Sequence, residues 1–530
     1  KWINTLPEIR LGRPVNESAK DTVTVSFTFM SIVKLCVGIS GSPYSRTFSK
    51  DSVQLTDVNG DGYVDYVTSR NEGSMTVRYN QSGKTNLLRK VTNFTGSTIE
   101  LGYDMPLACF DKPQRSWNLA RVETRNNDTL CPVGGNRTLT KFQYASPRYN
   151  RHERMDYGYG KVTTYQYDTD GGDTLYRFTV EEFNNREFNK RGRKLRECGY
   201  NSDSLPYVEH IGGDTLYDYA GSLVTDGGCA RTDVYVKKEV DITNWYEGQP
   251  SPQITSMTQR EYDRYRNVER YTHYGDITHT DEYFRAEIEY AQNMPHNMVS
   301  LPVRIEVYDI DDTLLQMRTA DYNPNNGRMT TLRLHNYSDT ARYDFGHDSY
   351  GNMSDATMPA NANGQRLTMK YQYDNTVHTY PVWVLNSDLG YYSTAEYDLR
   401  FGKPTKTTDI NGNEMWYEYD SLGRTVTVTA PYKQGVAPYT IRMEYFPHNF
   451  KKLDVWTNCS NPYSYACTYH YDKQHPGNPI RTTLITDGLG RLLQTKKDAE
   501  ISGQEVSLVT GKVVYDCFGR TVAQYHPFTE

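Results

Sequence analysis

A short acidic segment offers the sharpest local chemistry in this sequence. It reads Asp57-Val-Asn-Gly-Asp-Gly-Tyr-Val-Asp65, and the side-chain oxygens of Asp57, Asn59, Asp61 and Asp65 occupy its positions 1, 3, 5 and 9. Glycine at position 6 allows a sharp turn, and Tyr63 at position 7 can contribute its backbone carbonyl. Calcium accepts about six to eight oxygen ligands at flexible angles, so this spacing predicts a structural Ca²⁺ site.

Two features distinguish this loop from a helix–loop–helix calcium site. Position 12, which carries a bidentate glutamate in such sites, is Thr68. The flanking segments, Val53–Leu55 and Tyr63–Thr68, have the composition of strands. The loop therefore resembles the calcium loop of an FG-GAP or integrin-type propeller blade. An ion-free hairpin rich in Asp, Asn and Gly is the alternative, and neither interpretation makes the loop catalytic.

No residue of the chain is predicted to be catalytic. Metalloprotease, P-loop and dinucleotide-binding motifs are absent from the sequence, and Gly38-Ile-Ser-Gly-Ser42 lacks the last glycine of a nucleophile elbow. His470 and His475 could share a metal, and Asp311 with Asp312 could serve a glycosidase. Adjacent carboxylates in so acidic a chain are more often a solvated loop. The sequence thus favours a scaffold over an enzyme.

The overall composition limits the classes of function. Lys and Arg number 59 against 65 Asp and Glu, a net charge of −6, whereas a dedicated nucleic-acid binder should be basic. A basic run does lie at Lys190, Arg191, Arg193, Lys194 and Arg196. We interpret it as a solvated turn and strand face, with an interaction patch as the alternative. The sequence contains no apolar run long enough to span a membrane.

The chain is predicted to be folded although its mean hydropathy is −0.77. It contains 46 tyrosines, and tyrosine buries its ring while its hydroxyl forms hydrogen bonds. The eight cysteines are too dispersed for a disulfide framework, although Cys459 and Cys467 lie in an expected hairpin and could pair.

Period-2 alternation predicts strands rather than helices throughout the chain. Segments such as Thr425–Thr429 and Val162–Tyr167 alternate over five to six residues, and turns rich in Gly, Asn and Asp interrupt such runs every ten or so residues. This pattern indicates a large antiparallel β architecture.

An internal repeat marks many of these turns. The dipeptide Tyr-Asp occurs eleven times, about three times more often than composition predicts. Asp is favoured at the first position of a type I turn, and a Gly three residues later supplies the left-handed conformation that closes a bulged hairpin. The residues predicted to form these structural turns are Asp263; Asp348 and Gly351; Asp409 and Gly412; Tyr419, Asp420, Gly423 and Arg424; Asp487, Gly490 and Arg491; and Tyr515, Asp516, Gly519 and Arg520. In the unit that begins at Tyr262, Arg266 replaces the expected glycine.

These units resemble the YD (Rhs) repeat. The stretches 397–424 and 487–495 are close to the typical repeat sequence of that family. Leu87–Tyr103 is similar to the segment that follows the propeller in SpvB-like and Tc-toxin B-type proteins, and Tyr157–Val162 is similar to a glycine-aromatic landmark further along them. The resemblance runs from about residue 50 to the C-terminus, and the units between 150 and 390 are degenerate.

The resemblance implies an all-β fold: a spiralling ribbon of antiparallel hairpins preceded by a propeller remnant. The expected domains are the end of an FG-GAP-like propeller over 1–85, a connecting β region over 86–250, and a YD-repeat shell over 251–530. In such proteins the ribbon closes into a hollow shell around the C-terminal polypeptide of the assembly, usually a toxin. The implied role is a secreted or cell-surface scaffold, bacterial in origin, that encloses and delivers this segment.

The implied partners are the remainder of the same shell, the enclosed toxin segment, and a pore-forming or receptor-binding translocation subunit. Nucleic acid and a membrane span are not expected. Because the self-cleavage segment and a variable toxin region are not in the sequence, we expect the chain to be the middle piece of a larger protein.

Two other functions remain open at this stage. A teneurin-like adhesion or recognition ectodomain would expose a contiguous aromatic patch, whereas a shell would stack its tyrosine rings between successive hairpins. A carbohydrate-active enzyme would need two carboxylates facing each other across a cleft, and the sequence nominates no such pair.

Overall fold

The computed structural model describes the chain except residues 1–15, 31–35, 52, 60–61, 72–73, 82–85, 127–135, 225–230, 280, 337–338, 434–436 and 448–463. The described residues form strands, turns and three short 3₁₀ helices, η2 (Phe188–Lys190), η3 (Met294–His296) and η4 (Pro431–Lys433), with no α-helix among them. The predicted all-β fold class is confirmed. The described part contains no helix long and apolar enough to cross a membrane.

The chain divides into two compact units. Unit 1 comprises Lys1–Arg89, Leu101–Ala120 and Pro147–Asp156, and unit 2 comprises Lys90–Glu100, Arg121–Ser146 and Tyr157–Glu530. The first strands of unit 1 are β1 (Asn16–Met30), β2 (Cys36–Asp51), β3 (Val53–Thr56), β4 (Asp65–Asn71) and β5 (Ser74–Arg78). β1 and β2 form one antiparallel hairpin, and β3, β4 and β5 form a three-stranded sheet. The propeller remnant predicted for 1–85 remains a prediction.

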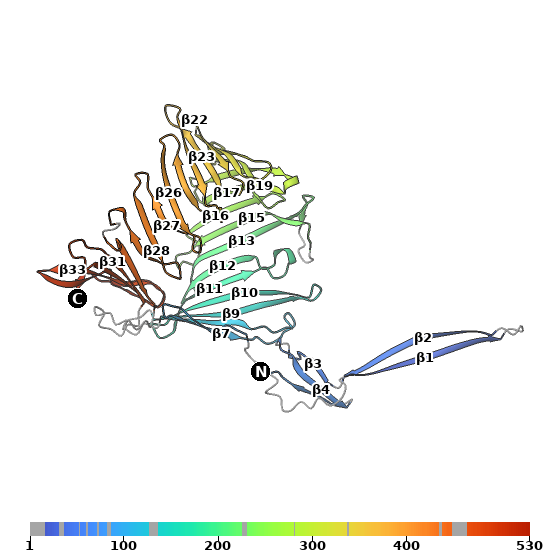
Figure 1. Ribbon diagram of the computed structural model, residues 1–530. Helices are drawn as coiled ribbons and strands as arrows, with labels where there is room; N and C mark the ends of the chain where they lie inside the picture. The colour runs from blue at the N-terminus through green and yellow to red at the C-terminus, as the bar shows by residue number, and fades with distance from the viewer. Residues whose placement is uncertain are drawn as a thin grey trace. The chain divides into compact units, whose positions relative to one another are not determined.

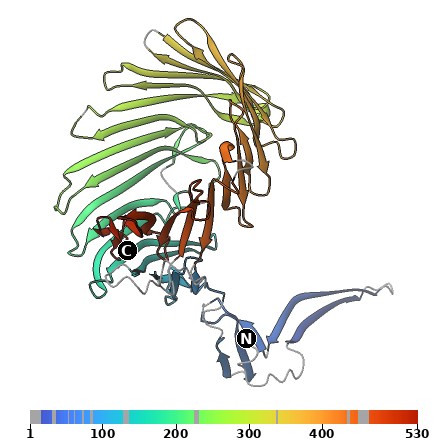
Figure 2. The ribbon, with the colours of Figure 1, turned by 60° about the vertical axis from the view of Figure 1, so that its left-hand side comes forward.

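One long antiparallel sheet makes up most of unit 2, and Figures 1 and 2 show its strands following one another in chain order around a curved surface. Its first half contains β6 (Lys90–Thr92), β7 (Thr98–Asp104), β8 (Asn118–Arg125), β9 (Arg137–Asn150), β10 (Met155–Asp168), β11 (Thr174–Phe183), β12 (Lys194–Asn201), β13 (Pro206–Asp218), β14 (Leu223–Val224), β15 (Val234–Trp245), β16 (Ile254–Tyr262), β17 (Val268–Asp276), β18 (Phe284–Asn293), β19 (Met298–Tyr308), β20 (Leu314–Tyr322) and β21 (Met329–Asn336).

The second half of the sheet continues the same succession of hairpins. It contains β22 (Asp339–His347), β23 (Met353–Ala360), β24 (Arg366–Tyr373), β25 (Pro381–Asn386), β26 (Tyr391–Asp398), β27 (Lys403–Thr408), β28 (Glu414–Tyr419), β29 (Thr425–Thr429), β30 (Ile441–Phe446), β31 (Ser464–His470), β32 (Ile480–Thr486), β33 (Leu492–Ile501), β34 (Gln504–Thr510) and β37 (Phe528–Thr529). A separate hairpin joins β35 (Val513–Tyr515) to β36 (Thr521–Gln524).

The strand order returns to its start, so the sheet is closed. From β10 the order runs to β34, then through β37 to β6, β7, β8 and β9. Closure removes the free edges that would otherwise invite pairing with other chains. β15 pairs with β16 across the boundary predicted at 250, Trp245 opposite Ile254, so one sheet continues from the expected connecting region into the expected shell.

The sheet is a single layer, and its described residues form two small buried hydrophobic clusters. One joins Phe446, Tyr465, Cys467 and Ile485, and the other joins Leu216, Val224 and Val234. Most other side chains of the sheet are half-buried. A single layer leaves two broad faces to be covered by something other than a second sheet.

Candidate functional site

The acidic loop lies in unit 1, and Gly60 and Asp61 are outside its described residues. Asp65 is fully buried, and its carboxylate accepts the backbone N–H of Val58 at 2.9 Å and that of Asn80 at 2.8 Å. Asp57 closes the loop by accepting the Gly62 N–H at 2.8 Å. Each carboxylate oxygen has a second lone pair, so these bonds are compatible with a cation ligand at the same atoms. Calcium at this loop remains a prediction.

The predicted turn residues share one local geometry. In the turn of Asp420, the carboxylate accepts the N–H groups of Leu422 and Arg424, both at 2.9 Å, and Gly423 has φ of 75°. The aspartates at 263, 348, 409, 487 and 516 accept the equivalent N–H groups, and the glycines at 351, 412, 490 and 519 have φ between 79° and 105°. These residues are turn formers rather than groups that face a common site.

The arginine that ends a complete repeat also connects it to the next strand pair. Arg424 pairs its Nε with Asp420 at 2.7 Å and lies over the ring of Tyr445, 4.5 Å from the centroid. Arg491 repeats this arrangement with Asp487 and Tyr515, at 2.6 and 4.5 Å. The cation–π contact adds to the hydrogen bonds of the turn and fixes the spacing of successive hairpins.

Sequence reasoning missed the role of the tyrosine hydroxyls. The hydroxyl of Tyr445 donates to the Thr425 carbonyl at 2.8 Å, and Tyr419 donates to the Pro404 carbonyl at 2.6 Å. The acceptor carbonyl lies just beyond the preceding turn. The same bond recurs from Tyr290, Tyr322, Tyr373, Tyr397 and Tyr515. We call this bond the tyrosine clasp; the sequence signal for it is a tyrosine about 15 to 23 residues after the turn that it binds.

Between β18 and β31 the two faces of the sheet differ in chemistry. Cross-strand partners place charged residues of both signs on one face, the charged face: Glu287, Arg304, Glu306, Asp321, Arg333, Asp344, Asp355, Lys370, Glu396, Lys406, Glu414, Glu418, Arg442 and Glu444. Several of these residues form cross-strand ion pairs, such as Arg333 with Asp321 at 2.7 Å and Lys406 with Glu414 at 2.6 Å.

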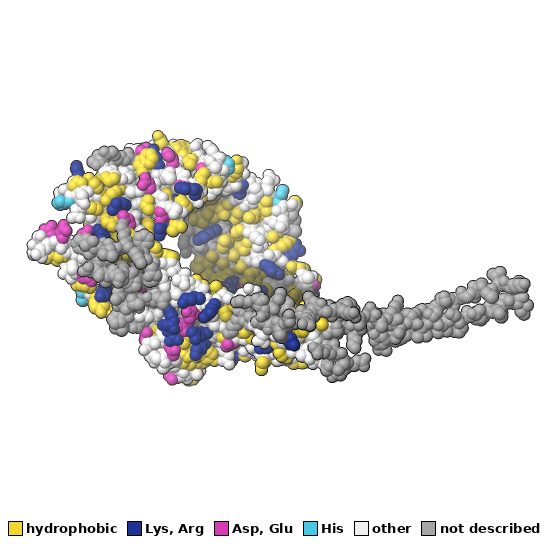
Figure 3. Space-filling view, turned by 60° about the horizontal axis from the view of Figure 1, so that its bottom comes forward, with side chains coloured by type: hydrophobic (Ala, Val, Ile, Leu, Met, Phe, Trp, Pro, Cys, Tyr) yellow, Lys and Arg dark blue, Asp and Glu magenta, His cyan; other side chains and the backbone are white. Residues whose placement is uncertain are grey.

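The opposite face is the apolar face. Its paired positions include Ala286, Ile288, Ile305, Val307, Ala320, Leu332, Leu334, Phe345, Ala356, Met369, Tyr371, Val384, Ala395, Met415, Tyr417, Val428, Ile441 and Met443. Charged residues are few at the described paired positions of this face, and Arg318 and Asp339 are among them, with His470 opposite Ile441. Its large side chains remain half-exposed. Figure 3 shows a hollow whose visible wall is largely hydrophobic, whereas charged side chains are scattered over the surface around it.

Two late repeat turns make the contacts across the seam that closes unit 2. In the first seam contact, the carboxylate of Asp487 is fully buried and accepts the Asn126 amide at 3.3 Å, across 361 residues of chain. The Gly488 N–H donates to Asn126 Oδ1 at 2.6 Å, and the Thr95 hydroxyl donates to the Gly488 carbonyl. A Cβ on Gly488 would lie well inside contact distance of the Asn126 carbonyl oxygen, so this position requires glycine.

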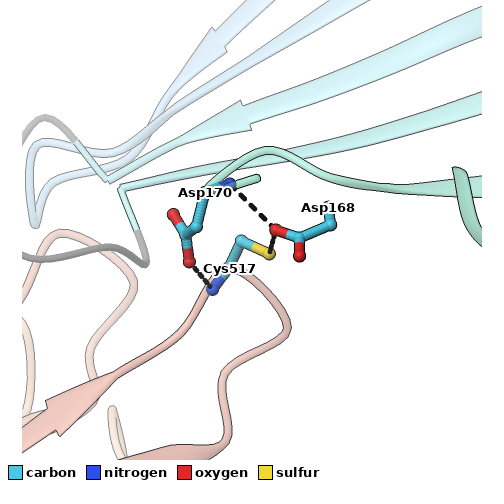
Figure 4. Close-up of side chains that lie close together, drawn as sticks. All are labelled: Asp168, Asp170 and Cys517. Atoms are coloured by element: carbon cyan, nitrogen blue, oxygen red, sulfur yellow. Dashed lines mark hydrogen bonds between the residues drawn. The ribbon is translucent and has the colours of Figure 1, made fainter. Parts of the chain in front are cut away.

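The second seam contact joins the turn at Cys517 to the β10–β11 turn (Figure 4). Asp170 accepts the Cys517 N–H at 2.9 Å, and the thiol donates to Asp168 at 3.5 Å. The rings of Tyr176 and Phe518 pack with centroids 4.3 Å apart.

Asp168, Asp170 and Cys517 bring three potential metal-ligand atoms within 4.8 Å of one another. Backbone N–H groups and the Cys517 thiol donate hydrogen bonds to the two carboxylates. Burial raises the pKa of the Cys517 thiol, which disfavours the thiolate that a metal would require. The cluster therefore acts as a structural contact between distant turns.

The remaining candidates from the sequence are accounted for by local structure. In the basic run, Arg193 pairs with Asp214, Lys194 with Glu181 and Arg196 with Glu209, at 2.9, 2.5 and 2.5 Å. These ion pairs join the basic run to acidic residues of neighbouring strands on a partly exposed surface of the sheet, as expected for a solvated turn and strand face.

Of the other pairs, His475 binds Asp472 of its own turn at 2.8 Å, and Asp312 pairs with Arg285 at 2.8 Å. Cys467 is a free, buried thiol beside the Thr483 hydroxyl, and Cys459 lies outside the described residues.

Comparison with known proteins identifies the fold. No family model and no curated protein matches the chain. Among solved structures, that of TcdB2-TccC3 with Cdc42 matches with a TM-score of 0.65 at 14% identity, over 92% of this chain and 36% of that chain. TcdB2-TccC3 alone gives 0.65 at 14%, over 96% and 35%. The Photorhabdus luminescens Tc holotoxin pore carrying a TccC3 mutation gives 0.64 at 14%, over 92% and 35%.

The chain therefore spans about a third of the length of the structures that it matches. The resemblance to Tc-toxin B-type shell proteins, suggested by the repeats, is confirmed at the level of the fold, which this chain shares with the TcdB2-TccC3 complexes over nearly all its length.

Proposed function

We propose that this chain is one part of a closed, non-enzymatic β-sheet shell that encloses and delivers an unfolded toxin polypeptide. The observation that carries the proposal is the apolar face of β18–β31, which no described layer of the chain covers. A contiguous apolar surface whose side chains stay partly accessible is typical of a binding function in soluble proteins. An unfolded polypeptide, which exposes the apolar side chains that a folded protein buries, complements this face.

The tyrosines favour a shell over an adhesive surface. Their rings pack between neighbouring strands, as in Phe178 against Tyr200 at 4.9 Å and Tyr380 against Tyr397 at 5.1 Å. Clasp hydroxyls are also engaged by backbone carbonyls, which leaves them unsuited to glycan contact. A teneurin-like recognition role is therefore the second candidate, to be distinguished by experiment.

The fold match supports the kind of partner that we propose. The matched structures are complexes of TcdB2 with TccC3, one of them in a holotoxin pore and another lacking a hypervariable C-terminal region. By analogy, this chain would work with the rest of its shell, with a C-terminal toxin segment and with a translocation subunit, in a secreted or cell-surface assembly of bacterial origin. The proposed structural Ca²⁺ would stiffen the loop at Asp57–Asp65.

Protease protection of the full-length gene product tests the shell. The protein is digested under native conditions, and mass spectrometry follows its C-terminal segment. We expect the segment to survive until denaturant unfolds the sheet, and to be digested early in Asp487→Ala, whose first seam contact is broken. Asp409→Ala, which alters an ordinary turn, is the matched control. Immediate digestion of the segment while the body stays intact would refute enclosure and favour surface recognition.

The calcium loop is tested separately by thermal unfolding with added Ca²⁺ and with chelator. A rise in the midpoint with Ca²⁺ that is lost in Asp57→Asn is expected from a coordinated cation. An identical midpoint in both conditions would identify the ion-free hairpin.

A further inference from the structure

A polar pocket lies in unit 2, away from the seam and from the β18–β31 faces. It has a volume of about 300 Å³ and lies among η2, β13, β15 and the β16–β17 turn. Its apolar lining comes from Leu216, Val234, Val236 and the rings of Tyr235 and Tyr262. This size and mixed lining suit a small organic molecule rather than water alone.

The charged residues that line the pocket are Arg193, Arg266 and Glu239. Glu239 accepts the Tyr262 hydroxyl at 2.5 Å and lies 3.7 Å from Arg260. Arg193 pairs with Asp214 at 2.9 Å. Arg266 also lines the pocket, and no ion pair to it occurs among the described residues. Arg193 is paired with Asp214, and Glu239 shares Arg260 with Asp241, so Arg266 is the lining charge that has no ion pair among the described residues.

A second, independent observation also points to a missing acceptor. The side-chain Nδ2 of Asn189 is buried, lines the same pocket and has no hydrogen-bond partner. A buried donor without a partner costs about 1–3 kcal/mol unless a ligand or water satisfies it. Asn189 and Arg266 therefore both lack the acceptor that an anion would supply.

The backbone at Arg266 adds a third observation. Its φ is 69°, in the left-handed region, and it occupies the position at which the turns of Asp348, Asp409, Asp420, Asp487 and Asp516 have glycine, whereas the Asp309 turn has Asp312 there with φ of 61°. A long side chain at such a position is strained relative to glycine. The guanidinium is therefore placed at the pocket at some cost to the turn, which a functional contact would explain.

We propose that this pocket binds a small organic anion: a carboxylate on an aromatic or apolar body. The carboxylate accepts from Arg266 and Asn189, and the body packs against Leu216, Val234 and the tyrosine rings. Glu239, whose oxygen is engaged by Tyr262, excludes a second negative charge on the ligand. The site is independent of the container role, since no residue of the seam contacts lines it.

Calorimetric titration of the full chain with phenylacetate and with its neutral amide, phenylacetamide, tests this assignment. We expect phenylacetate to bind and phenylacetamide to bind at least about tenfold more weakly. Arg266→Gly restores the repeat glycine and relieves the strained φ, so it should unfold at an equal or higher denaturant concentration while losing phenylacetate affinity at least about tenfold.

Arg264→Ala is the matched control, because it removes the same charge from the same turn but its side chain does not line the pocket. It should leave affinity unchanged. Equal binding of the amide, unchanged affinity in Arg266→Gly, or no binding of phenylacetate by the folded chain would each overturn the proposal. Inorganic phosphate binding as tightly as phenylacetate would overturn the assigned ligand class.

Discussion

The turns at Asp409 and Asp487 have the same local structure and different places in the molecule. Each aspartate accepts the N–H groups two and four residues on, and each is followed by a glycine of similar φ, 79° at Gly412 and 80° at Gly490. The Asp409 turn is exposed, whereas Asp487 is fully buried against Asn126. The same aspartate-glycine turn therefore reverses the chain at Asp409 and also closes the sheet at Asp487. The difference lies in the residue that packs against the turn.

Replacing the buried aspartate should separate the two turns most clearly. In Asp487→Ala, Arg491 loses its carboxylate partner and the donors at Leu489 and Asn126 lose their acceptor. Breaking a buried pair of this kind costs about 3–5 kcal/mol. Urea unfolding followed by tryptophan fluorescence should show a large drop in midpoint.

Asp409→Ala should lower that midpoint far less, because solvent replaces the lost acceptor. Equal effects of the two substitutions would mean that burial at the seam adds nothing to the turn.

The residue after each aspartate gives a second comparison. Gly488→Ala forces a methyl group against the Asn126 backbone carbonyl, and overpacking of this kind costs about 2–3 kcal/mol. Ile410→Ala, at the same repeat position of the exposed turn, should be nearly neutral because Ile410 is 57% exposed. Hydrogen exchange of the Asn126 and Gly488 amides would locate the change. Native protection at both amides in Gly488→Ala would show that the seam does not pack as described.

Loss of a tyrosine clasp should lower stability by a smaller amount, and clasps occur at exposed turns as well as at seam turns. Tyr445→Phe removes the hydroxyl donated to the Thr425 carbonyl at 2.8 Å and should cost about 1 kcal/mol. Tyr391→Phe is the control, because that ring is 53% exposed and lies outside the clasp series. Denaturant titrations of the two variants would be compared, and equal midpoints would reduce the clasp to a geometric coincidence.

The smallest expected effect is a pH dependence of the ordinary turns. Burial opposes ionisation of Asp420, but the backbone and side-chain hydrogen bonds of Arg424 outweigh it and hold the pKa of that carboxyl below its usual range. The side-chain and backbone hydrogen bonds of Asn413 likewise lower the pKa of Asp409. A lowered pKa in the folded state contributes stability above the ordinary aspartate pKa of about 3.9, and this contribution is lost as pH falls below it.

These turns should therefore give no stability change between about pH 7 and 5, and a loss below about pH 4. Urea midpoints measured at each pH check this, and Asp420→Asn should reduce the acid-side loss. A loss already complete at pH 5 would contradict the lowered pKa values.

Much of the fold was predictable because its information is local. Alternation over five to eight residues, together with Asp and Gly at fixed offsets, determines strands and turns from neighbours in the chain. The turn geometry at Asp420 and Gly423 therefore follows from the sequence. The tyrosine clasp was not predicted, because its donor and acceptor lie in different hairpins. Each tyrosine was already explained locally, as a buried ring at the end of a strand.

The seam was beyond any sequence argument. Asn126 and Asp487 are separated by 361 residues, and Gly488 differs from other turn residues only through what packs against it. Likewise, Arg266 was visible as a departure from the repeat, but its place beside Asn189 depends on the packing of η2 against the sheet.

By itself, the sequence determined that this chain forms an antiparallel ribbon of hairpins with amphipathic strands and aspartate-glycine turns. Only the tertiary structure decided how the ribbon closes, which turns hold the seam, and that no described layer of the chain covers the apolar face of β18–β31. The physical reason is separation along the sequence. Hydrogen bonds within a turn join residues about two to four positions apart, whereas closure of the sheet depends on contacts between residues hundreds of positions apart. The local periodicity of the sequence does not encode such contacts.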